Sequence, residues 1–316
     1  MTRHPGSPTF RFSPAPFIPF ADAAEVARVR AIRREQLARH WNPDFRITII
    51  PNAEVEFRWI ADMFHRIHTA AVEGRQLVMI TPNPWPSYAK IAYLINMFRL
   101  DCRHLWTFNM DEYANEDGEI APESWEFGFM HAFKKYFWAE IDADLRPPAH
   151  QVNGPTTENI DRYSDMIAER GGADICYSGP GWTGHLAFIE PDAPEFAGSL
   201  EEWKRMGARV CTLHPLTVAQ NSMHGSFGAS GDLWAVPPKA ATIGPRDVIG
   251  AKHRIDMHAI SVDGSRVSWQ RMITRLVLHG PVTPRLPQSL LQTLPTDVWV
   301  AESSAQDIEP HWEIGY

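Results

Sequence analysis

Short apolar segments alternate with longer helix-like segments along most of the chain, and this alternation constrains the fold more than any other feature. The strand-like segments lie at 46–50, 76–80, 105–108 and 173–177. Segments predicted to be helical lie at 54–72, 86–98, 123–139 and 157–170. Such alternation is typical of parallel sheets covered on both faces. The sequence therefore predicts an α/β fold with a mostly parallel, Rossmann-like doubly wound sheet and helices on both faces.

The chain of 316 residues is long enough to bury a large core. We predict a proline-rich N-terminal extension with a helix at 1–44, an α/β domain at 45–305 and a tail at 306–316. The net charge of −8 argues against nucleic-acid binding, and no apolar stretch approaches the length of a membrane span. Three scattered cysteines favour reduced thiols and a cytoplasmic location, and no Cys/His cluster has the spacing of metal ligands.

Polar side chains follow two of the predicted strands. Asp111 and Glu112 lie in a predicted loop at 111–113, just after 105–108, and His185 lies in the loop after 173–177. Sites in parallel α/β sheets lie outside the carboxyl ends of the strands. Carboxylates and an imidazole can move protons on a sugar carbon near neutral pH. We therefore predict that these residues belong to the active site of an enzyme.

Two motifs in the correct order carry a family resemblance. The run Phe-Asn-Met-Asp-Glu-Tyr at 108–113 resembles the central motif of glucosamine-6-phosphate deaminases, also called isomerases. The run Ser-Gly-Pro-Gly-Trp-Thr-Gly-His-Leu-Ala-Phe-Ile-Glu-Pro at 178–191 resembles the second motif of that family. The resemblance covers roughly residues 45–305. Within it we expect substrate contacts from the residues Glu112, Tyr113, Gly181, Trp182 and Gly184.

The resemblance implies a role for each matching residue. Asp111 is expected to be the base that moves a proton between C2 and C1 of the sugar, and His185 is expected to help open the ring. Glu190 is expected to support His185. Thr183 stands where the family has a second supporting aspartate, so it either takes part in catalysis or only caps a turn. The resemblance further implies fructose 6-phosphate and ammonia as products, with no metal or organic cofactor.

The chain departs from the family at the positions that bind the substrate phosphate. The loop Thr-Pro-Asn-Pro-Trp-Pro at 81–86 has three prolines without an N–H group, where the family has a loop rich in Gly, Thr and Ser. Met223 stands in place of an arginine, and Arg266 only approximately matches the position of a lysine. We therefore expect a ligand without a 6-phosphate or with another group there. Trp85 and Trp182 are then either an aromatic platform for the sugar or packing residues.

Three functional interpretations remain open at this point. The leading one is an isomerase or deaminase that acts on a small amino sugar, classed with hydrolases and isomerases of carbohydrate metabolism. A sugar-binding or regulatory homologue without full catalytic power is the second. A 6-phosphogluconolactonase-like hydrolase is the third, although such enzymes lack the Asn-Met-Asp-Glu-Tyr run. Because the family commonly forms oligomers, we expect a homo-oligomer.

Overall fold

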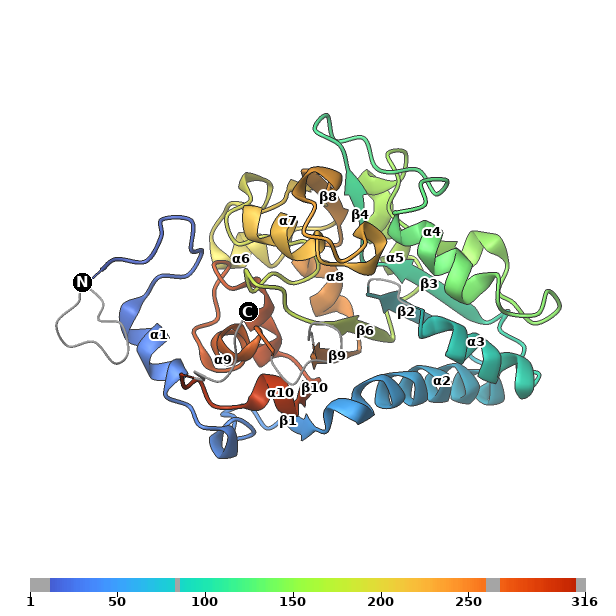
Figure 1. Cartoon of the computed structure of the whole chain (residues 1–316). Helices are drawn as coiled ribbons and strands as arrows, with labels where there is room; N and C mark the ends of the chain where they lie inside the picture. The colour runs from blue at the N-terminus through green and yellow to red at the C-terminus, as the bar shows by residue number, and fades with distance from the viewer. Residues whose placement is uncertain (1–11, 83–85, 260–267, 311–316) are drawn as a thin grey trace.

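The computed structural model describes residues 12–82, 86–259 and 268–310, and its centre is a seven-stranded parallel sheet (Figure 1). In spatial order the strands are β1 (Phe45–Ile50), β10 (Thr296–Ala301), β9 (His253–His258), β6 (Ile175–Ser178), β2 (Leu77–Thr81), β3 (Leu105–Asn109) and β5 (Val152–Asn153). Every neighbouring pair in this sheet is parallel. The predicted fold class is therefore confirmed.

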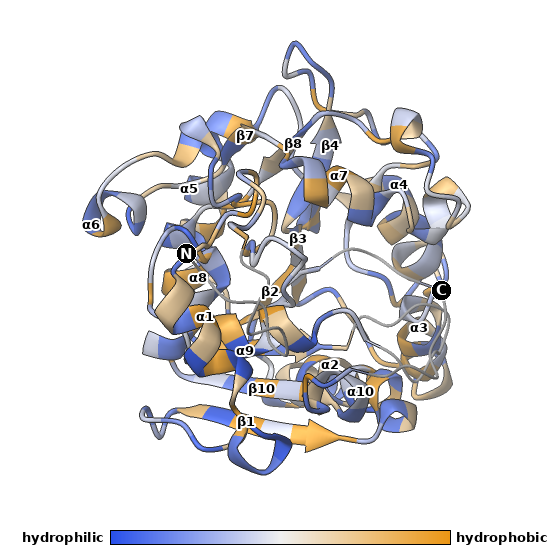
Figure 2. Ribbon diagram, turned by 60° about the vertical axis from the view of Figure 1, so that its left-hand side comes forward, coloured by the Kyte–Doolittle hydropathy of each residue, from blue (hydrophilic) through white to orange (hydrophobic). Residues whose placement is uncertain are grey.

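Helices cover both faces of the parallel sheet. One face packs against α2 (Val55–Glu73), α3 (Tyr88–Met97) and α4 (Phe129–Phe133). The other packs against α1 (Ala23–Arg30), α5 (Tyr163–Ala168), α8 (Pro245–Gly250) and α9 (Arg271–His279). Figure 2 shows α1, α8 and α9 together on the side away from α2 and α3.

The alternation of side chains along a strand explains why the sheet has two apolar layers. In β2, Leu77 and Met79 belong to the cluster under α2 and α3, whereas Val78 and Ile80 belong to the cluster under α9. Successive side chains of a strand point to opposite faces, so a strand with helices on both sides is apolar throughout. All of β2 is buried for this reason.

A second, smaller sheet was not predicted. It is antiparallel and consists of β4 (Asp111–Ala114), β8 (Lys239–Thr242) and β7 (Arg209–Thr212). The sequence predicted a loop at 111–113, because a polar Asp-Glu-Tyr run lacks the pattern of a strand. Asp111 instead pairs with Thr242 of β8, and the segment is buried.

One predicted helix starts later than expected. The sequence predicted a helix over 123–139, but α4 begins at Phe129 and continues as a π-helical turn, η3 (Lys134–Trp138). The start depends on a contact that is distant in sequence, because the Glu112 carboxylate accepts the N–H groups of Phe129 and Met130. A π-turn is wider than an α-turn and is often found at functional sites.

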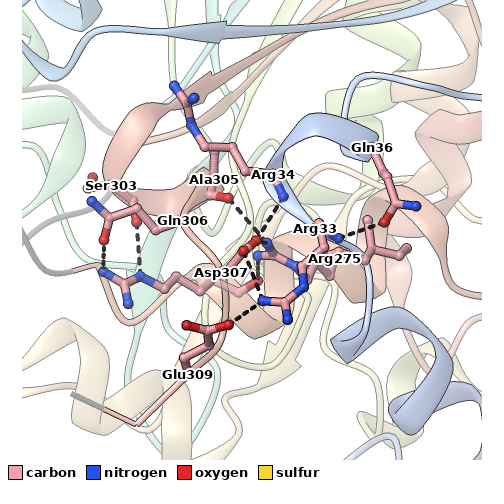
Figure 3. A network of polar contacts seen from close by, with 11 residues as sticks. Arg33, Arg34, Gln36, Arg275, Ser303, Ala305, Gln306, Asp307 and Glu309 are labelled. Carbon is pink, nitrogen blue, oxygen red and sulfur yellow. Dashed lines mark hydrogen bonds and ion pairs between the residues drawn. The ribbon is translucent and has the colours of Figure 1, made fainter. Parts of the chain in front are cut away.

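The two ends of the chain contact each other (Figure 3). Arg33 lies 3.0 Å from Asp307, and the buried Arg275 of α9 lies 3.7 Å from the same carboxylate. Residues of the predicted extension, 1–44, and of the predicted tail, 306–316, therefore share one polar network. The division of the chain into three parts stays a prediction. In the described part of the chain, no helix is both long and apolar enough to cross a bilayer.

Candidate active site

A cavity of about 880 Å³ lies outside the carboxyl ends of four neighbouring strands. Its wall includes a residue or residue pair after each of them: Pro82 after β2, Met110 and Asp111 after β3, Ser178 and Gly179 at the end of β6, and Ala259 after β9. This is the position that the strand order predicts for a ligand site. Asp111, Gly181 and His185, predicted from two separate motifs, all line this one cavity.

Asp111 is a buried carboxylate that faces the cavity. It is 3% exposed, and it accepts no hydrogen bond from any described residue. Burial, with the nearby Glu112 carboxylate, raises the pKa of Asp111 well above its ordinary value. A carboxylate with a raised pKa and no protein donor is a stronger base toward a bound ligand.

Glu112 has a structural role in this arrangement. Its carboxylate accepts the N–H groups of Tyr113 at 2.9 Å, Phe129 at 3.0 Å and Met130 at 2.8 Å. It thereby satisfies free donors at the start of α4, where a negative charge is favourable. Burial raises the pKa of Glu112 to about 6. Among the described residues it is not part of the cavity wall, so the structure does not place it at the substrate.

We expect Glu112→Ala to lower the free energy of unfolding by about 3 kcal/mol, because buried N–H groups would lose their acceptor. Urea denaturation measures this change. Glu116→Ala, at an exposed position two residues after β4, serves as the matched control and should stay within about 0.5 kcal/mol of the wild type. Equal effects of the two substitutions would contradict the capping role.

His185 is held by a short chain of polar contacts. Its Nδ1 atom lies 3.4 Å from Glu190 Oε1 and 3.2 Å from the Thr217 hydroxyl. Thr183 donates its hydroxyl hydrogen to Glu190 Oε2 at 2.9 Å. Because a carboxylate can only accept hydrogen bonds, Nδ1 carries the proton of the neutral imidazole. The Nε2 atom is then free to take a proton from a ligand and to return it. The structure places Glu190 in contact with both His185 and Thr183, and the catalytic roles of the three residues stay predictions.

Thr183 acts on this pair through its hydroxyl group, not through a charge. We expect Thr183→Val to lower kcat/KM by about tenfold, because the nearly isosteric valine leaves Glu190 without this donor. Thr183→Ser retains the hydroxyl and should keep most of the activity. Steady-state kinetics on both variants tests the role, and a serine variant as impaired as the valine variant would contradict it.

The turn that carries His185 depends on tight backbone packing. A Cβ atom on Gly181 would lie 2.3 Å from His185 Nε2 and 2.7 Å from the Gln220 side-chain oxygen. Ala187, which lines the cavity, has a positive φ of 53°, a conformation that a non-glycine residue rarely adopts. Strained backbone of this kind is concentrated at functional sites.

Several residues predicted to bind substrate lie elsewhere. Tyr113 is fully buried among aromatic rings, and within the described ranges its hydroxyl has no hydrogen-bond partner. The ring of Trp182 packs edge-on against Trp269 at 4.6 Å, and Gly184 occupies a turn with a φ of +77°. None of these three is among the described residues that line the cavity. Trp85 and Arg266 lie outside the described residues, so their predicted roles stay predictions.

The cavity wall also contains polar residues that the sequence analysis did not select as ligand-binding. Gln220 and Asn221 of α7 (Pro215–Asn221) line it, as do His224 and Lys135. Burial, with a contribution from His185, lowers the pKa of His224 to about 4. The Asn221 Nδ2 group is buried and has no partner among the described residues. In the sequence, the Asn-Ser-Met run at 221–223 differs from the family by lacking an arginine, and His224 belongs to no motif.

Over residues 12–82, 86–259 and 268–310 no group of three or more His, Cys, Asp or Glu side chains is arranged to hold a metal ion. The chemistry described here uses a carboxylate and an imidazole and needs no metal ligand. The absence of a cofactor stays an expectation from the family resemblance.

Solved structures share this fold. A monomeric glucosamine-6-phosphate deaminase of the NagB superfamily aligns with a TM-score of 0.65 at 18% identity, covering 82% of this chain and 98% of that chain. A 6-phosphogluconolactonase from Leishmania guyanensis aligns with a TM-score of 0.58 at 13% identity, covering 84% of this chain and 98% of the lactonase. At such low identity these matches establish the fold alone.

Sequence relatives are more specific. The chain matches no protein-family model. The glucosamine-6-phosphate deaminase of Rhodopirellula baltica is 29% identical over 229 residues, which are 71% of this chain and 80% of the relative. The enzyme of the same name from Porphyromonas gingivalis is 31% identical over 215 residues, which are 66% of this chain and 74% of the relative. This identity and coverage, together with the shared fold, show that the chain belongs to the glucosamine-6-phosphate deaminase family.

Proposed function

We propose that the protein is an isomerase that releases ammonia from an amino sugar of the glucosamine type. The observation that carries the proposal is the cavity itself, in which an unpaired buried carboxylate and a carboxylate-supported imidazole face the same space. Proton transfer between neighbouring carbons and ring opening each need one of these groups. Both groups come from the motifs by which the chain resembles its family.

In the proposed reaction His185 Nε2 takes the proton from the sugar hydroxyl at C1 and passes it to the ring oxygen as the bond between C1 and that oxygen breaks, which opens the ring to the aldehyde. Asp111 then removes the proton from C2 while the substrate's ammonium group gives a proton to the carbonyl oxygen at C1, which forms an enolamine with a hydroxyl at C1. The same proton returns from Asp111 to C1, which leaves a protonated imine at C2. Water adds to this imine, and ammonia leaves as the C2 ketone forms.

An ammonia assay tests the proposal. The wild-type protein is incubated separately with glucosamine 6-phosphate and with glucosamine, and ammonia and the ketose product are followed together. For each sugar that is turned over, we expect ammonia and the ketose in equal amounts. Solvent deuterium at C1 or C2 without ammonia would restrict the activity to isomerisation. No turnover of either sugar would contradict the proposal.

The lactonase alternative has less support. Lactonases appear among the solved structures with the same fold, but at 13% identity in the match reported above. Hydrolysis of 6-phosphogluconolactone in a parallel assay would favour this alternative. Sugar binding without any turnover would favour the regulatory homologue.

We further infer a cytoplasmic protein that forms a homo-oligomer and binds neither nucleic acid nor membrane. The three cysteines are all free and buried, which fits a reducing compartment. The negative net charge supports the absence of nucleic acid. Light scattering at several protein concentrations measures the oligomeric state.

A further inference from the structure

The cavity wall contains one lysine and no arginine among the described residues, and this lysine is Lys135. The acidic side chains of the wall are Asp111, Glu56 and Glu126. Glu56 is neutralised from outside the wall, since its carboxylate lies 2.7 Å from the ammonium group of Lys90. Among the described residues of the wall, Lys135 is therefore the one whose permanent positive charge a negatively charged ligand can reach.

Lys135 is also free to take a ligand. No described carboxylate pairs with it, although its neighbour Lys134 forms an ion pair with Glu123. The Lys135 ammonium group lies 5.3 Å from the ring centre of Tyr136, a residue that also lines the cavity. An ammonium group with no protein counter-charge is available to bind an anion.

The helix that carries Lys135 is tied to the strand that carries the proposed base. Glu112, the neighbour of Asp111, accepts the N–H group of Met130 at the start of α4. Lys135 lies five residues further, in the π-helical turn that continues α4. His131, Ala132, Lys135 and Tyr136 all line the cavity, so this face of α4 and the π-turn is turned toward the ligand space. Asp111 and Lys135 therefore line the same cavity from two different elements.

The loops that the family resemblance assigns to the phosphate contribute no described cation. Pro82 and Pro86 line the cavity, and neither has an N–H group to donate. Met223 is not part of the described wall. The described residues of these loops offer no positive charge to a phosphate ester, whereas Lys135 does.

We propose that Lys135 is a specificity-determining residue that binds the anionic group of a phosphorylated substrate from the π-turn after α4. The inference rests on the proposed function for the identity of the sugar.

Binding measurements test this inference without depending on turnover. Asp111→Asn, which removes the base, is titrated by calorimetry with glucosamine 6-phosphate and with glucosamine. We expect the phosphate ester to bind at least about tenfold more tightly. Adding Lys135→Met should abolish this preference. Adding Lys134→Met should preserve it, because Lys134 is already paired and lies outside the described cavity wall.

In the otherwise wild-type enzyme, Lys135→Met should raise KM for glucosamine 6-phosphate by about tenfold or more, with little change in kcat. A preference for the phosphate ester that survives Lys135→Met, or the absence of any preference before it, would overturn the inference. Failure of the proposed function is recognised separately, since it means that the wild-type protein releases no ammonia from either sugar.

Discussion

Asp111→Asn is expected to lower kcat by about 1,000-fold, because the amide cannot accept the proton from C2. The substitution nearly conserves size, and the side chain has no protein hydrogen bond to lose among the described residues. Substrate binding should therefore change much less than turnover. Ammonia release under saturating substrate measures the effect.

Asp117→Asn is the matched control for this substitution, because Asp117 is exposed in the turn after β4. Its activity should stay within about twofold of the wild type. If Asp111→Asn retains substantial activity, the assignment of the base is wrong, whatever the control shows.

Asp111→Asn should also be more stable than the wild type at high pH. The pKa of Asp111 is raised in the folded protein, so the folded chain binds a proton more tightly than the unfolded chain. Stability therefore falls as the pH rises from the unfolded value, about 3.9, through the folded value. Asparagine does not ionise, so the variant lacks this loss of stability with rising pH. We expect the variant to have a Tm at least about 2 °C higher than the wild type at pH 8, with the difference vanishing near pH 4.

Gly181→Ala is expected to lower kcat/KM by about 100-fold through the position of His185. The added Cβ atom would lie 2.3 Å from Nε2 and 2.5 Å from Cε1 of a ring that is almost fully buried. The ring must turn or move, and Glu190 and Thr217 then lose their contacts with Nδ1. Kinetics, with the Tm measured alongside, separates a displaced imidazole from an unfolded protein.

Gly225→Ala provides the matched comparison for this prediction. Gly225 also lies at the cavity, but a Cβ atom there would meet no atom within 4 Å. It should retain activity to within about threefold. If both alanine variants lose activity equally, narrowing of the cavity explains the loss and displacement of His185 does not.

The parallel sheet could be predicted from sequence because its signal is local. Strands such as β2 are short apolar runs between amphipathic helices, and their burial on both faces requires this pattern. Asp111 and His185 could be predicted for a similar reason. Each follows such a strand directly, and the carboxyl ends of neighbouring parallel strands meet at one edge.

Other features depend on contacts between distant segments and leave no local signal. The antiparallel sheet requires Asp111 to meet Thr242, and no pattern within either segment specifies that partner. Glu112 was predicted to contact substrate because its motif suggested a function, whereas its carboxylate caps a helix that begins seventeen residues later. Lys135 could not be predicted, because a lysine in an aromatic-rich helix has no sequence pattern that distinguishes it from a surface lysine. Only the folded structure places it in the cavity wall.

The pairing of the first strand with the last has a consequence for synthesis in the cell. β1 lies at the edge of the parallel sheet, and its strand partner is β10, 251 residues later. A ribosome that adds 5–20 residues per second needs roughly 10–50 s to make the intervening chain. During that interval the nascent β1 has no native strand partner, so a chaperone has this time in which to act on its unpaired backbone.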